Sequence, residues 1–275
     1  MMDGLRKPRK GIEMPELPDV EVFREYFNST ALHQKIVEIR VEHNKVLEAI
    51  SGRRLKDALS GRSFETTDRR GKYLFAQTDD DVVLVLHFGM TGYLLYAKSP
   101  GPEDKHIRVL FSFENDYNLG YICQRLLGKV AVTDSVKDFV ASRQLGPDAL
   151  DISLEDFKQV LKDARGSLKS TLMNQSRLAG LGNVYTDEVL FHARLHPATT
   201  AGDLSESDLK KLHRNMQKVL NKTIEKQADP AGMPRSYMLP HRGRDGSCPR
   251  CKRNLETMKV SGRKTYFCPK CQPAP

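Results

Sequence analysis

Four of the five cysteines in this chain lie in its last 28 residues, as two Cys-x2-Cys pairs that sixteen residues separate. Each pair can clamp one side of a tetrahedral ion, and four thiolates complete a closed zinc site with no open position for catalysis. Such a site folds a short segment that has too little hydrophobic core of its own. We therefore expect one structural Zn2+ ion, bound by Cys248, Cys251, Cys268 and Cys271.

The fifth cysteine, Cys123, stands alone and is predicted to be a buried strand residue. A disulfide framework would spread its cysteines along the chain, so this distribution indicates a metal site in a reducing compartment. No stretch approaches the roughly 18–20 apolar residues of a membrane span. The basic start of the chain has no apolar segment behind it, which excludes a secretory signal. We expect a cytoplasmic protein without a membrane partner.

The net charge of the 275-residue chain is +9, and the excess lies at its two ends. Residues 241–275 hold nine Lys/Arg against two Asp/Glu, residues 1–13 hold four against two, and residues 14–240 hold 31 of each sign. A basic terminal module on a neutral body suggests a polyanionic partner. A solvated basic tail is the alternative interpretation of the same charge.

The order of strand and helix signals predicts an α+β chain. Residues 18–27 read as a short helix with Pro18 in its first turn, and strands of an antiparallel sandwich or barrel follow. The strand segments are 35–43, 63–78, 82–97, 107–114, 117–123 and 129–133. Helices are then predicted over 153–164, 167–178, 183–195 and 206–227. Residues 228–240 hold three prolines and read as a linker, and residues 260–267 read as a hairpin.

Five sequence motifs in a fixed order carry a resemblance to a known family. They are PELPDVE behind Met14, RRGKYL at 69–74, LHFGMTG at 86–92, LAGLGNVYTDEVLF at 178–191 and GRKTYFCPKCQ at 262–272. The chain resembles the formamidopyrimidine-DNA glycosylase family, which includes the endonuclease VIII proteins, over essentially all of 14–275. A single motif would be weak evidence, whereas five motifs in the family's order make the probability of a chance resemblance very small.

The resemblance implies a fold, an activity and a partner. The fold has an N-terminal antiparallel β-sandwich with a leading helix, a helical domain with a helix–two-turn–helix, and a C-terminal zinc-finger hairpin. We expect these domains at 14–135, 136–240 and 241–275, with 1–13 as an extension. Family members bind double-stranded damaged DNA in the cleft between the domains, remove the damaged base and cleave the strand at the abasic site. We expect a monomer associated with the nucleoid.

Pro15 and Glu16 match the family's nucleophile and its acid. A terminal proline is a secondary amine whose pKa lies near roughly 8, and it can attack the sugar C1′. An internal proline nitrogen is a tertiary amide and cannot do this. From the residues alone, Pro15 also reads as an ordinary proline that leads a helix, and Glu16 as a carboxylate favoured by a helix dipole. Position 19 holds Asp where the family commonly has Glu.

Lys72 and Arg263 match the residues that the family uses for strand cleavage. Lys72 lies in a turn that enters a strand, and its family counterpart serves β-elimination and contacts phosphate. Arg263 lies in the predicted zinc-finger hairpin, and its counterpart serves δ-elimination. A guanidinium fork suits a phosphate and a departing phosphate oxygen. A solvated basic turn is the alternative interpretation of Arg263 and its neighbour Lys264.

The DNA contacts that the resemblance implies are mostly basic or polar. Base removal from a duplex requires that the nucleotide leave the stack, and Met90, expected at a hairpin tip, matches the residue that fills the gap. A core methionine is its alternative reading. Leu127 stands where the family often has an aromatic filler, so it can wedge but cannot stack as a ring. Asn183 opens a predicted helix whose N-terminus favours phosphate. The DNA-binding candidates are His106, Arg125, Arg165, Lys169, Asn183 and Met90, and His87 can also meet the backbone.

Two features leave the substrate and the activity open. Family members specialised for 8-oxoguanine carry a long capping loop before the zinc finger, whereas this chain has only about a dozen residues there. Its substrate is therefore a formamidopyrimidine, an oxidised pyrimidine or a hydantoin. If residues 1–13 stay attached, Pro15 is acylated and the chain is a damaged-DNA binder or a weak lyase through Lys72. The simplest account is that Met14 is the true start. An unrelated zinc-ribbon module on a helical domain is the third reading.

Overall fold

A computed structural model describes residues 14–99, 105–243 and 245–274, so the expected extension at 1–13 lies outside the described residues. The chain divides into two compact units. The first holds the chain up to Pro15 together with Asp19–Ser142, and the second holds Glu16–Pro18 together with Arg143–Pro275. Among the described residues, no helix combines the length and the apolar composition that a membrane crossing requires.

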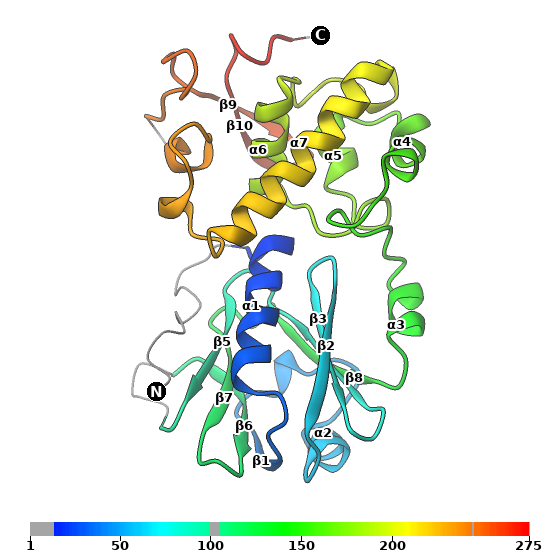
Figure 1. Ribbon diagram of the computed structural model, residues 1–275, viewed down its shortest axis with the longest axis vertical. Coiled ribbons are helices and arrows are strands. Elements are labelled where there is room, and N and C mark those ends of the chain that lie inside the picture. Colours follow the sequence, from blue (N-terminus) through cyan, green and yellow to red (C-terminus); the bar gives the residue numbers. More distant parts are fainter. Residues whose placement is uncertain (1–13, 100–104, 244, 275) are drawn as a thin grey trace. The chain divides into compact units, whose positions relative to one another are not determined.

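The first unit is an antiparallel β-sandwich with a leading helix, as the sequence predicts (Figure 1). One sheet has the order β1-β6-β7-β5 and the other β2-β3-β4-β8. The unit comprises most of α1 (Leu17–Thr30), then β1 (Ile36–Val41), α2 (Gly52–Leu59), β2 (Phe64–Arg70), β3 (Tyr73–Thr78), β4 (Val83–His87), β5 (Gly92–Ala97), β6 (Ile107–Phe113), β7 (Asn118–Cys123), β8 (Lys129–Thr133) and α3 (Val136–Ser142).

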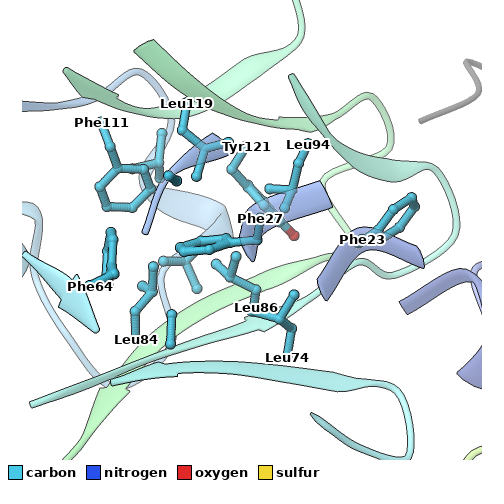
Figure 2. Packing of buried hydrophobic residues seen from close by; sticks show 14 of the residues in the cluster. Phe23, Phe27, Phe64, Leu74, Leu84, Leu86, Leu94, Phe111, Leu119 and Tyr121 are labelled. Atoms are coloured by element: carbon cyan, nitrogen blue, oxygen red, sulfur yellow. The ribbon is translucent and has the colours of Figure 1, made fainter. Parts of the chain in front are cut away.

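Helix α1 supplies part of the core of this sandwich. Phe23 and Phe27 lie one helical turn apart and are fully buried, and they belong to the same core cluster as residues of both sheets (Figure 2). The ring of Phe23 lies 4.5 Å from that of Phe88, and the ring of Phe27 lies 5.1 Å from that of Phe64. Burial of each such side chain contributes about 1.5–3 kcal/mol. The chain directly behind Pro15 is therefore held by core packing.

The second unit is helical and ends in a hairpin. It comprises α4 (Leu154–Lys162), α5 (Leu168–Leu172), α6 (Asn183–Ala193), α7 (Glu206–Glu225), the turns η3 (Ala201–Asp203), η4 (Pro230–Gly232) and η5 (Leu239–His241), and the strands β9 (Glu256–Val260) and β10 (Arg263–Phe267). Ser153 and Ser205 cap α4 and α7, each accepting a backbone hydrogen bond from the residue three positions on. Helix α7 packs on α6, and its apolar residues Leu212, Met216 and Val219 are fully buried.

The structure differs from the sequence-based expectations in several places. Helices α2 and α3 were not predicted, and the helix expected over 167–178 is reduced to α5. The segment 228–240 is no loose linker, because Tyr237 and Met238 are buried in it. The carboxylate of Glu188 accepts hydrogen bonds from Met238 N at 2.9 Å and Leu239 N at 2.6 Å. Two of its three prolines, Pro230 and Pro240, lie in the first two positions of the short turns η4 and η5, where a missing N–H costs little.

Candidate active site and nucleic-acid interface

Pro15 lies buried just before α1 begins at Leu17. In the described chain its nitrogen belongs to the Met14–Pro15 peptide bond. The residue ahead of it, Met14, has φ of 61° and donates its N–H to the carbonyl of Met90 at 2.7 Å. Only loss of Met14 converts the Pro15 nitrogen from an amide into an amine that can act as a nucleophile.

The carboxylate of Glu16 lies at the N-terminus of α6 and is 1% exposed. It accepts hydrogen bonds from Gly182 N at 2.8 Å, Val184 N at 2.8 Å and Tyr185 N at 3.2 Å. These are backbone donors that the helix itself cannot satisfy, and the helix dipole favours a negative charge there. A carboxylate of the chain therefore already takes three of the N–H groups at this N-terminus, while no bond from Asn183 N to it is among them.

Lys72 lies in a two-residue turn between β2 and β3, where Arg70 pairs with Tyr73. Gly71 has φ of 58°, a left-handed conformation that glycine adopts at little cost. The side chain of Arg69 holds this turn from inside, because its Nη1 donates to Gly71 O at 3.1 Å. Arg69 Nε in turn donates to Glu21 Oε2 at 2.8 Å. The buried Glu21–Arg69 pair thus positions the turn that carries Lys72.

Glu21 and Arg69 are site-supporting residues that the sequence did not reveal. Glu21 also pairs with Arg24, one turn along α1. Burial alone would raise the pKa of Glu21, but hydrogen bonds from Arg24 and Arg69 hold that pKa below its usual 4.5. The RRGKYL motif contains Arg69, yet only the fold shows that its partner lies on α1.

Met90 lies on the connection between β4 and β5, and these strands belong to different sheets. The expected hairpin tip is therefore wrong: the turn residues of GMTG carry the chain from one sheet to the other. The Met90 turn lies against the β7–β8 loop, since Arg125 N donates to Thr91 Oγ1 at 3.2 Å. In that loop Leu127 is 48% exposed.

Gly89 makes the contact between this turn and this loop possible. It has φ of 60°, and a Cβ atom at this position would lie 2.5 Å from the backbone of Leu127 and Gly128. The absence of a side chain lets the two backbones touch. The fold therefore brings the turn of Met90 to the loop of Leu127, the two residues that the resemblance places at the gap in the duplex, with the DNA-binding candidate Arg125 in the same loop.

His106 precedes β6, and its Nδ1 lies 3.1 Å from Arg108 Nη2. Desolvation, followed by the positive charges of Arg108 and Lys105, lowers the pKa of His106 below its usual 6.5. The shift favours the neutral imidazole, which can offer a phosphate a hydrogen bond.

The three remaining DNA-binding candidates lie in the second unit in different environments. Arg165 is exposed in the turn after α4. Lys169, by contrast, is 0% exposed, and its Nζ donates to Asn183 Oδ1 at 2.7 Å and to Asp187 Oδ1. Asn183 begins α6. The amine of Lys169 is therefore already paired within the protein.

The four cysteines predicted as metal ligands lie together. Their sulfur atoms are all within 4.8 Å of one another, with Cys248 Sγ 3.8 Å from Cys271 Sγ and Cys251 Sγ 3.5 Å from Cys268 Sγ. Four sulfurs about 2.3 Å from a central zinc ion would be about 3.8 Å apart in a regular tetrahedron. The arrangement therefore fits a zinc site with four thiolate ligands. In the neighbouring hairpin, Ser261 and Gly262 form the two-residue turn, and Arg263 is exposed at the start of β10.

Three family models match the chain in order. They describe the formamidopyrimidine-DNA glycosylase N-terminal domain at 14–130, the H2TH domain of the same glycosylase at 145–233, and the zinc finger found in FPG and IleRS at 248–274. A curated relative from Herpetosiphon aurantiacus, named formamidopyrimidine-DNA glycosylase, is 32% identical over 272 residues, which cover 94% of this chain and all of the relative. The chain belongs to the formamidopyrimidine-DNA glycosylase family.

Other members of this glycosylase family support the same assignment. A relative of the same name from Streptococcus pyogenes is 33% identical over 94% of this chain and 98% of its own length. The Lactococcus lactis enzyme in complex with abasic-site DNA matches with a TM-score of 0.84 at 30% identity. The same enzyme with DNA that contains an oxidised pyrimidine matches with a TM-score of 0.86 at 31% identity. Each covers 94% of this chain and 100% of the solved chain.

The zinc-finger model of the glycosylase family spans all four clustered cysteines. Together with the sulfur geometry, this match shows that the four-cysteine site holds one structural zinc ion. With four thiolate ligands the ion keeps no position for substrate, so its work is to fold the β9–β10 hairpin and its flanking turns.

Proposed function

We propose that this chain is a bifunctional DNA glycosylase and AP lyase of base-excision repair, which acts on oxidised or ring-opened bases in double-stranded DNA. The observation that carries the proposal is the start of the match: the N-terminal family model begins at residue 14. Pro15 is thus the second matched residue, and excision of Met14 exposes it as an amine. The relative from Herpetosiphon aurantiacus is matched over its whole length by 94% of this chain.

The first chemical step is base removal. The Pro15 amine attacks C1′ of the damaged nucleoside, the C1′–N bond breaks, and the base leaves with its electron pair and takes up a proton. Opening of the sugar ring, with loss of the proton from the Pro15 nitrogen, yields an iminium between Pro15 and C1′. Glu16 follows Pro15 directly and its carboxylate is fixed by three backbone hydrogen bonds. Its proposed role is to pass protons as the ring opens and the base departs.

The second stage is strand cleavage. The iminium acidifies C2′, so loss of a C2′ proton breaks the C3′–O bond and releases the 3′-side phosphate. Loss of a C4′ proton then breaks the C5′–O bond and releases the 5′-side phosphate. Water finally hydrolyses the iminium and frees Pro15. In this scheme Lys72 serves the first elimination and Arg263 the second, where its guanidinium compensates charge on the departing phosphate.

The DNA contacts divide by function. His106, Arg125 and Arg165 are proposed to meet phosphates, which gives sequence-independent and salt-sensitive binding. Met90 and Leu127 are proposed to fill the gap that the flipped nucleotide leaves. Lys169 and Asn183 stay in the proposed interface by resemblance, although the Lys169 amine is buried in the protein alone. In this proposal the chain is divided into the sandwich at 14–135, the helical domain at 136–240 and the finger at 241–275, and the protein works as a nucleoid-associated monomer.

The substrate proposal follows from the segment between α7 and the finger. This segment is short, and Glu188 holds its buried part through Met238 N and Leu239 N. A segment held in this way does not supply a long capping loop over a flipped base. We therefore expect excision of formamidopyrimidines, oxidised pyrimidines or hydantoins in preference to 8-oxoguanine, as single-turnover rates on matched duplexes can show.

The experiment that tests the activity has two parts. The intact mass of the natively expressed protein shows whether the chain begins at Pro15, and borohydride reduction with abasic-site DNA traps the iminium. A chain that begins at Pro15 and forms the adduct supports the enzyme. A chain that keeps residues 1–14, binds the DNA and never traps is instead a damaged-DNA binder. Pro15→Gly should weaken trapping and leave DNA binding largely intact, whereas equal loss of both indicates a folding role for Pro15.

A further inference from the structure

The outer edge of strand β10 is hydrogen-bonded by side chains of helix α6. Arg263 pairs with Val260 across the two-residue turn, so the backbone groups of Lys264 and Tyr266 point away from β9. Asn183 Nδ2 donates to Lys264 O at 3.2 Å, and Tyr266 N donates to Asp187 Oδ2 at 3.1 Å. Side chains of the helix therefore form the hydrogen bonds that the edge backbone groups of β10 would otherwise form with a further strand.

The spacing of these contacts matches the two elements. Asn183 and Asp187 are one helical turn apart on the same face, about 5–6 Å between their Cβ atoms. Lys264 and Tyr266 are two residues apart on one strand, about 6.8 Å along it. One helix face thus reaches two successive outward backbone groups, and the strand cannot slide along the helix without losing both contacts.

Lys169 connects the side chains of Asn183 and Asp187 by hydrogen bonds. Its buried Nζ donates to the Oδ1 atoms of both Asn183 and Asp187. Because an ammonium group only donates, it forces the oxygen of Asn183 to face it and the amide nitrogen to face Lys264 O. Asp187 is fully buried and uses its second oxygen for Tyr266 N and for Arg242 Nη2, the latter at 2.9 Å.

The charges of this cluster are compensated inside the protein. Burial lowers the pKa of Lys169, and the charge of Asp187 opposes that shift. Burial likewise raises the pKa of Asp187, against the effects of Lys169 and Arg242. A buried cation with a buried carboxylate partner has little charge to offer a phosphate, so the geometry indicates an internal role for Lys169.

We propose that Lys169, Asn183 and Asp187, here called the β10 clamp, are positioning residues that set where Arg263 is presented. Arg263 is exposed and immediately precedes Lys264, whose carbonyl the clamp holds. The inference rests on the proposed role of Arg263 in the second elimination. It adds that the zinc site folds the hairpin, while the clamp fixes the strand's position on α6.

The principal test is Asp187→Asn. A carboxylate accepts hydrogen bonds on both oxygens, whereas an amide offers one accepting oxygen and one donating nitrogen, so the variant loses contact with Lys169 or with Tyr266. We expect the ratio of β,δ- to β-elimination products on abasic-site DNA to fall roughly 10- to 100-fold, as misplacement of a reacting group does. Borohydride trapping and zinc content should stay near those of the parent protein, and the amides of 263–267 should exchange hydrogen faster.

A matched control is Asp148→Asn, the same change at a buried aspartate that accepts a backbone hydrogen bond from Leu150. It should leave the product ratio unchanged. If Asp187→Asn misfolds or loses zinc, Tyr266→Pro decides the matter. It deletes the clamped N–H at an outward edge position where proline is tolerated, with Tyr266→Ala as its side-chain control. Tyr266→Pro should lower the product ratio well below that of Tyr266→Ala.

The outcomes separate this inference from the proposed function. A parent protein that forms no trapped adduct overturns the function and, with it, the clamp. A parent that traps normally, combined with Asp187→Asn or Tyr266→Pro variants that keep its product ratio, overturns the clamp alone. Equal loss of trapping and of the second elimination in those variants also overturns it, because a general loss of fold would then explain both.

Discussion

The carboxylate of Glu16 accepts a hydrogen bond from the backbone N–H of Val184 at 2.8 Å. The residue after the proposed nucleophile is thereby fixed to the first turn of α6, a helix that lies far along the chain. This contact uses the helix N-terminus that the sequence suggested for phosphate, and it gives Glu16 a structural role beside its proposed chemical one.

We expect Glu16→Gln to destabilise the protein by about 1–2 kcal/mol, because a capping carboxylate is replaced by an amide with one acceptor. Denaturant unfolding measures the loss. Glu25→Gln, at an exposed position on α1, is the control and should stay close to the parent. A Glu16→Gln variant as stable as the Glu25→Gln control would contradict the capping role.

Removal of the zinc site should affect the hairpin and spare the sandwich. We expect Cys268→Ser, or treatment with a strong chelator, to lower bound zinc from one ion per chain and to abolish the second elimination, because the hairpin that carries Arg263 loses its fold. Zinc content by atomic emission and product analysis measure these effects. Cys123→Ser is the control: this cysteine ends β7, outside the cluster, and its variant should keep one zinc ion.

Gly89→Ala should push the Met90 turn away from the loop that carries Leu127. The new Cβ would meet backbone atoms at 2.5 Å and adopt φ of 60°, so we expect a loss of about 2–4 kcal/mol in unfolding free energy. Gly61→Ala has a similar positive φ but no atoms within 4 Å, and should cost about 1 kcal/mol. Both variants carry the cost of a positive φ, so the difference between their unfolding free energies isolates the cost of the close backbone contact at Gly89.

The same Gly89→Ala variant should flip its target base less well. The fluorescence of 2-aminopurine opposite or beside the lesion reports the extrahelical state. If the Gly89→Ala variant is less stable but gives the same fluorescence change as the parent, then the positions of Met90 and Leu127 in this turn and loop are not needed to fill the gap in the duplex.

Glu21 should contribute to stability in a pH-dependent way. The pKa of Glu21 lies below 4.5 in the folded protein, so its contribution is present above pH 4.5 and is lost as the pH falls through the folded value. We expect Glu21→Gln to be less stable than the parent at neutral pH, with the gap closing in acid. Unfolding free energies of the variant and the parent from pH 3 to pH 7 measure this difference in stability. A difference that stays constant across that range would refute the prediction.

Local patterns in the sequence determined most of the elements. Alternation of apolar residues predicts the strands, the capping box at Ser153 predicts the start of α4, and the spacing of the cysteines predicts the four-cysteine zinc site. These signals depend on neighbours within a few residues, so they can be read from the chain itself. Helix α2 has such a signal too, with Ser51 as its cap and Leu55 and Leu59 as its buried pair, but it is short and lies among stronger strand patterns.

The tertiary structure decided which partner each functional residue meets. The motif around Met90 looks the same whether its strands pair or belong to two sheets, because turn residues encode the bend and not the pairing. Lys169 reads as a basic DNA contact in the sequence, and only the fold shows that its amine is buried and paired with Asp187. Glu16 reads as a helix carboxylate, and only the fold supplies α6 as the helix that it caps. Long-range pairing and burial depend on the packing of the whole chain, whereas residue type and spacing are properties of the sequence itself.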